Sequence, residues 1–209
     1  MIKNSISSDE LRKKHWEGIF NRNDYTQVLW HQSSPNKSMT FIKEYSASKA
    51  KIIDVGCGAS NFVDKLLEDG YKNITLLDTS KTSLDIVKNR LGNKDINYIC
   101  QDILNFQTSE KFDIWHDRAV FHFLLSQKDR EKYFEVLNDS LNSGAIAIIS
   151  TFMTGGPIQC AGLDIVQYDE KKMLCELPSN LELIKSEEYI HITPKQSEQK
   201  YIYFVIRKS

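Results

Sequence analysis

The chain has 209 residues, of which 41% are hydrophobic and 26% are charged, and its formal net charge is -1. This size and balance are typical of one globular domain that buries a core without disulfides. They argue against a nucleic-acid-binding protein, which usually carries a basic excess, and no apolar run reaches the roughly 20 residues of a membrane helix.

The amino-terminal part of the chain predicts amphipathic helices. Its start, MIKNSISSDELRKKHW, lacks the apolar segment of a secretory signal, so we expect a cytoplasmic protein. Leu11, Trp16 and Phe20 are spaced to lie on one helical face. Pro35 is placed to begin a second helix.

From residue 50 onward the pattern changes to an alternation of strands and helices. Short apolar runs predict buried strands at 51–55, 74–77, 98–100, 112–115 and 145–150. Helical patterns begin at Ser60 and Ser80, and two more cover about 119–125 and 129–142. Such alternation indicates right-handed βαβ units and a parallel sheet covered on both faces. The stretches 183–193 and 201–207 have no helix between them and predict an antiparallel hairpin at the sheet edge.

A glycine-rich turn after the first of these strands carries the chemical signal. Asp54-Val-Gly-Cys-Gly58 leads from a strand into a helix, and its glycines allow a tight turn and a close approach to a ligand. Asp78 ends the second strand, where a carboxylate can accept hydrogen bonds from a ribose diol. Asp102 ends the third strand, within reach of an adenine amino group in this kind of fold. The sequence therefore predicts a nucleoside site at the carboxyl ends of the strands.

Two cofactors compete for this site. A nicotinamide dinucleotide favours G-x-G-x-x-G/A, but Asn61 stands at the third position and Asp54 would repel a pyrophosphate. S-adenosylmethionine has a cationic amino group, a sulfonium, a ribose and an adenine but no phosphate. Acidic residues at the ends of three successive strands suit that ligand better.

These motifs also carry a family resemblance. D-V-G-C-G, D-T-S at 78–80 and Q-D-I at 101–103 resemble motifs one to three of the class I S-adenosylmethionine-dependent methyltransferases. The resemblance covers roughly residues 48–150. Further stretches, among them HWEGIF, LWHQSSPNKS and FDIWHDRAVFHFL, are similar to a bacterial methyltransferase-domain group. More distantly, the chain resembles eukaryotic lysine methyltransferases that modify a translation elongation factor.

The resemblance implies a fold as well as an activity. The expected fold is an α/β, Rossmann-like three-layer sandwich, with a mostly parallel seven-stranded sheet in the order 3-2-1-4-5-7-6 and an antiparallel terminal hairpin. A single domain over 1–209 would comprise an amino-terminal helical cap (1–47), a cofactor-binding core (48–150) and an acceptor side (151–209). The implied cofactor is S-adenosylmethionine, and the product is S-adenosylhomocysteine.

Residue roles follow from the same resemblance. Asp54, Gly56 and Gly58 would line the methionine end of the cofactor. The ribose would meet Asp78 and Thr79, and the adenine would lie between Asp102 and Ile103. Trp30 stands where the group usually has S-W-[YF] and would cover the cofactor, although its neighbours depart from that pattern.

The resemblance also implies that His116 is the candidate catalytic residue, because it follows the fourth strand at the motif-four position, which in this family commonly faces the sulfonium and the substrate. A neutral acceptor must lose a proton, and His116 or, as a weaker candidate, His122 could take it. An acceptor that is already ionised needs no base. A buried, hydrogen-bonded histidine is the structural alternative.

Other residues have two interpretations each. Arg118 follows Asp117, so it could form a local ion pair or bind substrate. Trp16, Phe20 and Tyr25 could pack in the core or form an aromatic lid over the site. The four cysteines lack metal-binding spacing, so we expect reduced thiols and no metal site.

The leading hypothesis is methyl transfer to a small molecule, without nucleic-acid or membrane partners. A protein lysine methyltransferase is the first alternative, and a closed aromatic pocket would argue against it. A binding module with a vestigial methyltransferase fold and a nicotinamide dehydrogenase are the others. The sequence leaves the acceptor and the oligomeric state open.

Overall fold

A computed structural model describes residues 8–22 and 24–209 of the chain. Residues 1–7, at the start of the predicted helical cap, and residue 23 lie outside the described part. The helices are α1 (Ser8–Arg22), α2 (Asn36–Tyr45), α3 (Phe62–Glu68), α4 (Lys81–Leu91), α5 (Gln127–Ser140) and α6 (Glu170–Glu176). The strands are β1 (Ile52–Val55), β2 (Ile74–Asp78), β3 (Asn97–Cys100), β4 (Phe112–Arg118), β5 (Leu141–Phe152), β6 (Gln159–Cys160), β7 (Leu163–Asp164), β8 (Leu181–Ile192) and β9 (Glu198–Lys208). Short 3-10 helices are η1 (Tyr25–Gln27), η2 (Ile103–Asn105) and η3 (Phe121–Phe123).

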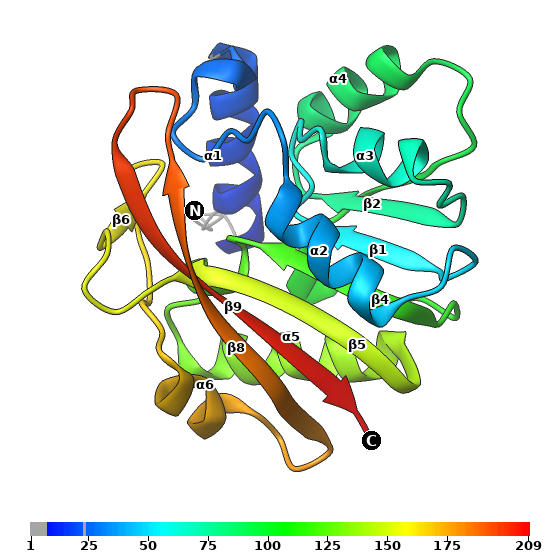
Figure 1. Cartoon of the computed structure of the whole chain (residues 1–209). Helices are drawn as coiled ribbons and strands as arrows, with labels where there is room; N and C mark the ends of the chain where they lie inside the picture. Colours follow the sequence, from blue (N-terminus) through cyan, green and yellow to red (C-terminus); the bar gives the residue numbers. More distant parts are fainter. Residues whose placement is uncertain (1–7, 23) are drawn as a thin grey trace, which may run out of the picture.

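Within these residues, seven strands form one sheet in the order β3-β2-β1-β4-β5-β9-β8 (Figure 1). This is the expected order 3-2-1-4-5-7-6, because β6 and β7 form a separate two-stranded sheet and do not enter the count. Neighbours from β3 to β5 pair in parallel, whereas β9 is antiparallel to both β5 and β8. The mostly parallel sheet with a terminal hairpin is therefore confirmed.

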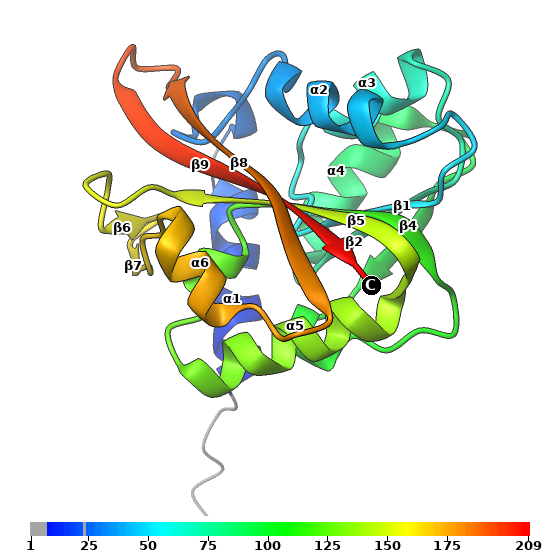
Figure 2. The ribbon, with the colours of Figure 1, turned by 60° about the horizontal axis from the view of Figure 1, so that its bottom comes forward.

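The helices make the outer layers of the sandwich. Figure 2 shows α2, α3 and α4 on one side of the sheet and α5 with α6 on the other. Each side has its own buried core: Phe41, Phe62 and Leu66 pack on the first, and Trp115, Phe121 and Tyr133 on the second. The central strands β1 and β2 are buried along their whole length, as expected for strands covered on both faces.

One expected helix is absent from this fold. The sequence predicted a helix over 119–125, but the chain makes only the single turn η3 there. The Asp117 carboxylate accepts the backbone N–H groups of Val120 and Phe121, at 2.8 and 3.1 Å, and Ala119 has a φ of 72°. These features end β4 in a tight, capped turn, because they use the N–H groups and backbone angles that an entering helix would need.

Helix α1 stands across the carboxyl ends of the parallel strands (Figure 1). Its Glu17 carboxylate accepts the backbone N–H of Lys81 at the start of α4, at 2.6 Å. A carboxylate is stabilised by the free N–H groups of a helix start. The pKa of Glu17 is accordingly lowered, since the bonds from the start of α4 outweigh the effect of burial. The contact holds α1 over the edge where α/β sheets bind ligands.

Candidate active site

A pocket lies where α1 meets the carboxyl ends of the central strands. Its wall includes residues from β1, β2, the β3–η2 turn, β4, α1 and the loop before α2. All the predicted cofactor residues line it: Trp30, Asp54, Gly56, Gly58, Asp78, Thr79, Asp102 and Ile103. His116, the predicted catalytic residue, lines it too. The structure thus brings together side chains that are up to 86 positions apart in the sequence.

The glycine turn requires its glycines at two positions. Gly56 and Gly58 have φ values of 63° and 53°, in the left-handed region that side chains disfavour. A Cβ on Gly56 would lie 2.0 Å from Cγ2 of Val120, which is a severe overlap. A Cβ on Gly58 would lie 3.0 Å from Cζ of Phe20 in α1. Both glycines therefore allow the close packing of the turn against its surroundings as well as its sharp bend.

Asp78 fixes the shape of this turn. Its Oδ2 accepts the N–H of Gly58 at 2.8 Å, and its Oδ1 accepts the N–H of Ser80 at 2.7 Å. The side chain is buried, and burial raises its pKa to about 6 despite these two backbone bonds. Each carboxylate oxygen has two lone pairs, so both retain capacity to accept a hydroxyl from the pocket. The N-cap of α4 is Ser80, whose hydroxyl accepts the N–H of Ser83.

Asp102 is tied to the amino-terminal helix. Its Oδ2 accepts the Arg12 Nε–H at 2.7 Å, and its Oδ1 accepts the N–H of Leu104 at 2.9 Å. The Asp102 side chain is 8% exposed and that of Arg12 is 27% exposed. Ile103 is buried beside it. The ion pair makes α1 part of the wall at the end of β3.

His116 is buried and bonded at both ring nitrogens. Nδ1 lies 2.7 Å from Oδ1 of Asp54, and Nε2 lies 2.8 Å from Oγ of Ser38 in α2. The imidazole also stacks on Phe62, with ring centroids 4.1 Å apart. These contacts hold the imidazole in one orientation. It orients Asp54 within the pocket.

Aromatic side chains form the opposite wall. Trp16 packs edge-on against Trp30 and Phe123, with centroids 6.1 and 5.2 Å apart, and Phe20 stacks on Tyr25 at 6.2 Å. All five line the pocket. Trp16, Phe20 and Tyr25 thus lie over the site, as the lid interpretation expects. Phe20 is also buried, so the lid and the core are continuous here.

His122 and Cys160 differ in where they lie relative to the pocket. His122 is buried away from the pocket wall, with Nδ1 accepting the N–H of Phe152 at 3.3 Å. Burial first, and Arg118 second, lower its pKa to about 3, so it stays neutral. Cys160 does line the pocket, but burial raises its thiol pKa to about 12. It is a neutral thiol rather than a nucleophilic thiolate.

Several wall residues carried no sequence signal. The sequence did not single out Arg12, Ser38 and Phe123, because no local sequence pattern shows which helix reaches the ends of the strands. Arg118, for which the sequence left substrate binding open, could also have been assigned to the wall from its spacing. It lies two residues after His116 on one strand, and such residues share a face.

Part of the chain is similar in sequence to known proteins. Residues 52–144 match the family described as "Methyltransferase domain". A malonyl-[acyl-carrier protein] O-methyltransferase of Ilyobacter polytropus is 28% identical over 149 residues, covering 70% of this chain and 55% of that protein. An EEF1A lysine methyltransferase of Danio rerio is 30% identical over 134 residues, covering 57% of this chain and 58% of that protein. The chain thus spans just over half the length of these two relatives.

Solved structures match over nearly the whole chain. A SAM-dependent methyltransferase from Anabaena variabilis has a TM-score of 0.76 at 16% identity, covering 98% of this chain and 96% of that one. The N-methyltransferase NodS from Bradyrhizobium japonicum, in complex with S-adenosylhomocysteine, has a TM-score of 0.69 at 16% identity, covering 97% and 99%. Residues 52–144 are therefore similar to a methyltransferase domain, and the chain shares its fold with solved S-adenosylmethionine-dependent methyltransferases.

Proposed function

We propose that this protein transfers a methyl group from S-adenosylmethionine to a small-molecule acceptor. The observation that carries the proposal is the make-up of one pocket. Carboxylates from the ends of β1, β2 and β3 line one side, and Trp16, Trp30 and Phe123 line the other. The acidic side suits a cationic ligand without phosphate, and the aromatic side suits an apolar acceptor held away from water.

The acidic side supports a specific placement of the cofactor. Asp78 has acceptor capacity for the ribose hydroxyls, with Thr79 beside it, and Asp102 and Ile103 frame the place for the adenine. Asp54 and the glycine turn would hold the methionine end, and Trp30 would cover it. S-adenosylmethionine supplies a methyl group on a sulfonium, whose sulfur leaves with the bonding electron pair.

The chain's own contribution is orientation and the exclusion of water. Proximity and alignment alone can lower a bimolecular barrier by about 7–11 kcal/mol. The contacts of Trp16 with Trp30 and Phe123 join α1, the loop before α2 and η3 into one cover. His116 is hydrogen-bonded to Asp54 and Ser38, so it is placed to orient the Asp54 side chain beside the methionine end of the cofactor. The base role predicted for His116 stays a prediction.

The enclosed aromatic wall favours a small molecule over a protein side chain. A lysine on a folded partner needs an open channel and a docking face, whereas here Trp16, Phe20 and Tyr25 stand over the strand ends.

The four cysteines are free thiols, which fits a reducing compartment such as the cytoplasm. No helix of the described residues is both long and apolar enough to cross a bilayer.

Calorimetry with the purified protein tests the cofactor assignment. S-adenosylhomocysteine should bind with 1:1 stoichiometry, and NADH should not compete with it. Binding of NADH alone would favour a dehydrogenase, and binding of neither ligand would refute the proposal.

A second experiment incubates the protein with methyl-labelled S-adenosylmethionine and a cell extract divided by size. Label in the small-molecule fraction supports the proposed acceptor class, and label only in protein supports a lysine methyltransferase.

A further inference from the structure

Arg118 presents a cation to the pocket and forms no ion pair with any carboxylate of the described residues. It ends β4, and its Nη1–H donates to the carbonyl oxygen of Trp30 at 2.9 Å. Its Nε and Nη2 are buried and have no hydrogen-bond partner within residues 8–22 and 24–209. A guanidinium stays charged at any working pH, so in the described part of the chain this cation has neutral neighbours only: the carbonyl of Trp30 and the ring of Tyr201.

The obvious partner faces the other way. Asp117 precedes Arg118, but successive strand residues point to opposite faces of a sheet. The Asp117 carboxylate instead accepts the Tyr133 hydroxyl at 2.6 Å on the α5 side, together with two backbone N–H groups. The local ion pair considered from the sequence is therefore not formed. The alternative, a role for Arg118 in substrate binding, is the one that the contacts support.

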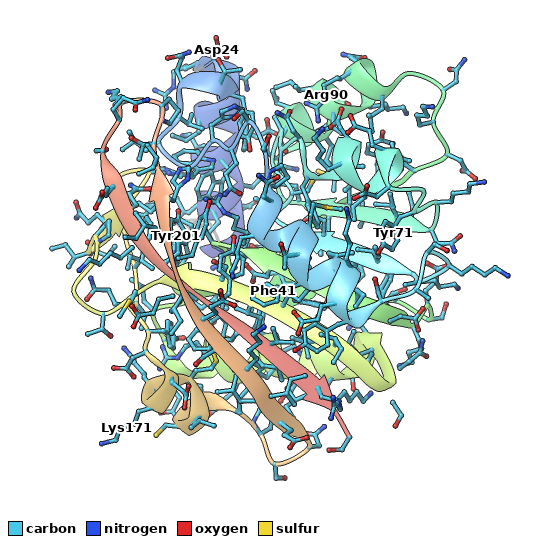
Figure 3. The ribbon with its side chains drawn as sticks, viewed as in Figure 1. Asp24, Phe41, Tyr71, Arg90, Lys171 and Tyr201 are labelled. Atoms are coloured by element: carbon cyan, nitrogen blue, oxygen red, sulfur yellow. The ribbon has the colours of Figure 1, made fainter. Side chains whose placement is uncertain are left out.

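Two neighbours of Arg118, Tyr201 and Cys160, come from the acceptor side of the chain, residues 151–209. The guanidinium carbon of Arg118 lies 4.8 Å from the ring centroid of Tyr201 on β9, which Figure 3 labels. The hydroxyl of Tyr201 is also buried without a hydrogen-bond partner. Trp30 and Cys160 line the pocket with Arg118, and Cys160 comes from β6. None of these neighbours comes from β1, β2 or β3, whose acidic ends make the cofactor side.

We infer that the acceptor carries an anionic group of the carboxylate type, and that Arg118 binds it. The inference rests on the proposed function and narrows its substrate to a class. A carboxylate matches the planar N–H pair of a guanidinium and satisfies Nε and Nη2 together. The aromatic wall accounts for the rest of the ligand. The acceptor is a small carboxylic acid with an apolar or aromatic body.

The methionine end of the cofactor is a second source of a carboxylate in the same pocket. The two sources are separable, because S-adenosylhomocysteine keeps that carboxylate and its decarboxylated analogue lacks it. If Arg118 binds the acceptor, its loss leaves the affinities for both cofactor compounds nearly unchanged. If it binds the cofactor, its loss weakens only the compound that keeps the carboxylate.

Calorimetry on the full chain with benzoate as probe tests the inference. Benzoate and its neutral counterpart benzamide are titrated into the protein saturated with S-adenosylhomocysteine. The variants are Arg118→Gln and Arg118→Lys, and Arg207→Gln serves as the control. Arg207 also ends in a guanidinium but pairs at the surface with Glu182, with side-chain exposures of 49% and 66%. Thermal unfolding of each variant without ligand shows that it folds.

Benzoate should bind the wild type and the Arg207→Gln variant, and benzamide should bind roughly 10- to 100-fold more weakly. The affinity for benzoate should fall by a similar factor in Arg118→Gln, and Arg118→Lys should retain part of the wild-type affinity. Equal binding of benzoate to the wild type and to Arg118→Gln, or none to the wild type, would overturn the inference. The inference would also be overturned if the Arg118→Gln variant lost affinity for S-adenosylhomocysteine only and kept its affinity for benzoate. If the wild type fails to bind S-adenosylhomocysteine at all, the proposed function itself is wrong.

Discussion

Replacing Asp78 by asparagine should weaken cofactor binding and remove its pH dependence. The carboxylate holds the Gly58 and Ser80 N–H groups at 2.8 and 2.7 Å and lines the pocket. Asparagine has a single acceptor oxygen, so the variant cannot serve both N–H groups and a ribose diol. Hydrogen bonds to a charged group contribute about 1.5–3 kcal/mol. The affinity for S-adenosylhomocysteine should therefore fall by roughly 10- to 100-fold.

The pH dependence provides a sharper measurement. Burial raises the pKa of Asp78 to about 6 in the free protein, so the group is mostly ionised at pH 7 and mostly protonated at pH 5. Hydroxyl donors favour the ionised form, so ligand binding should lower this pKa. The wild-type affinity should then decrease as pH falls through 6, by about tenfold between pH 7 and pH 5. The Asp78→Asn variant should lack this component.

Calorimetric titrations at pH 5, 6 and 7 measure both effects. Asp85→Asn is the matched control, because Asp85 lies on α4 as well but pairs with Lys81 at the surface, where its side chain is 50% exposed. The control should bind like the wild type at each pH. If the wild-type affinity is flat from pH 5 to 7, or if Asp78→Asn keeps the wild-type affinity, Asp78 only fixes the turn and does not meet the ligand.

Three further outcomes follow from the same contacts. Gly56→Ala should destabilise the fold by more than Gly144→Ala, because both glycines have positive φ but of the two only Gly56 has its Cβ position blocked, by Val120 at 2.0 Å. In chemical denaturation, the positive φ should cost each variant about 1 kcal/mol, and the overlap should cost Gly56→Ala several more. Equal losses of stability in the two variants would contradict this account. His116→Ala should weaken the binding of S-adenosylhomocysteine through Asp54; normal binding with lost turnover would instead support the base role. Burial also raises the pKa of Asp117 to about 6 from 3.8, so its protonated form favours folding and the free energy of unfolding should decline as pH rises from 4 to 6, by up to about 3 kcal/mol for this group. Asp117→Asn should reduce that slope, and an unchanged slope in denaturation curves would exclude this residue as its source.

The local sequence was enough to predict the acidic side of the pocket, where Asp54, Asp78 and Asp102 lie. Short apolar strands, each followed by a carboxylate, and a turn that only glycine accommodates are properties of neighbouring residues. Parallel strands place their carboxyl ends at one edge, so Asp54, Asp78 and Asp102 had to converge once the alternation was recognised. The resemblance to a known family added the strand order, which pattern alone leaves open. The helix predicted over 119–125 was wrong because Asp117 binds the backbone N–H groups of the residues that follow it. The neighbouring sequence does not reveal this role.

The tertiary structure alone decided which residues face that acidic side. An amphipathic helix shows that it will bury one face but not against what, so the sequence did not reveal that Arg12 would reach Asp102. The same holds for Ser38, which packing of α2 brings to His116. Arg118 is the clearest case: its adjacent carboxylate suggested an ion pair, and strand geometry directed the two side chains apart. Contacts between distant segments depend on how whole elements pack, and the neutral surroundings of Arg118, which point to an acidic acceptor, arise only there.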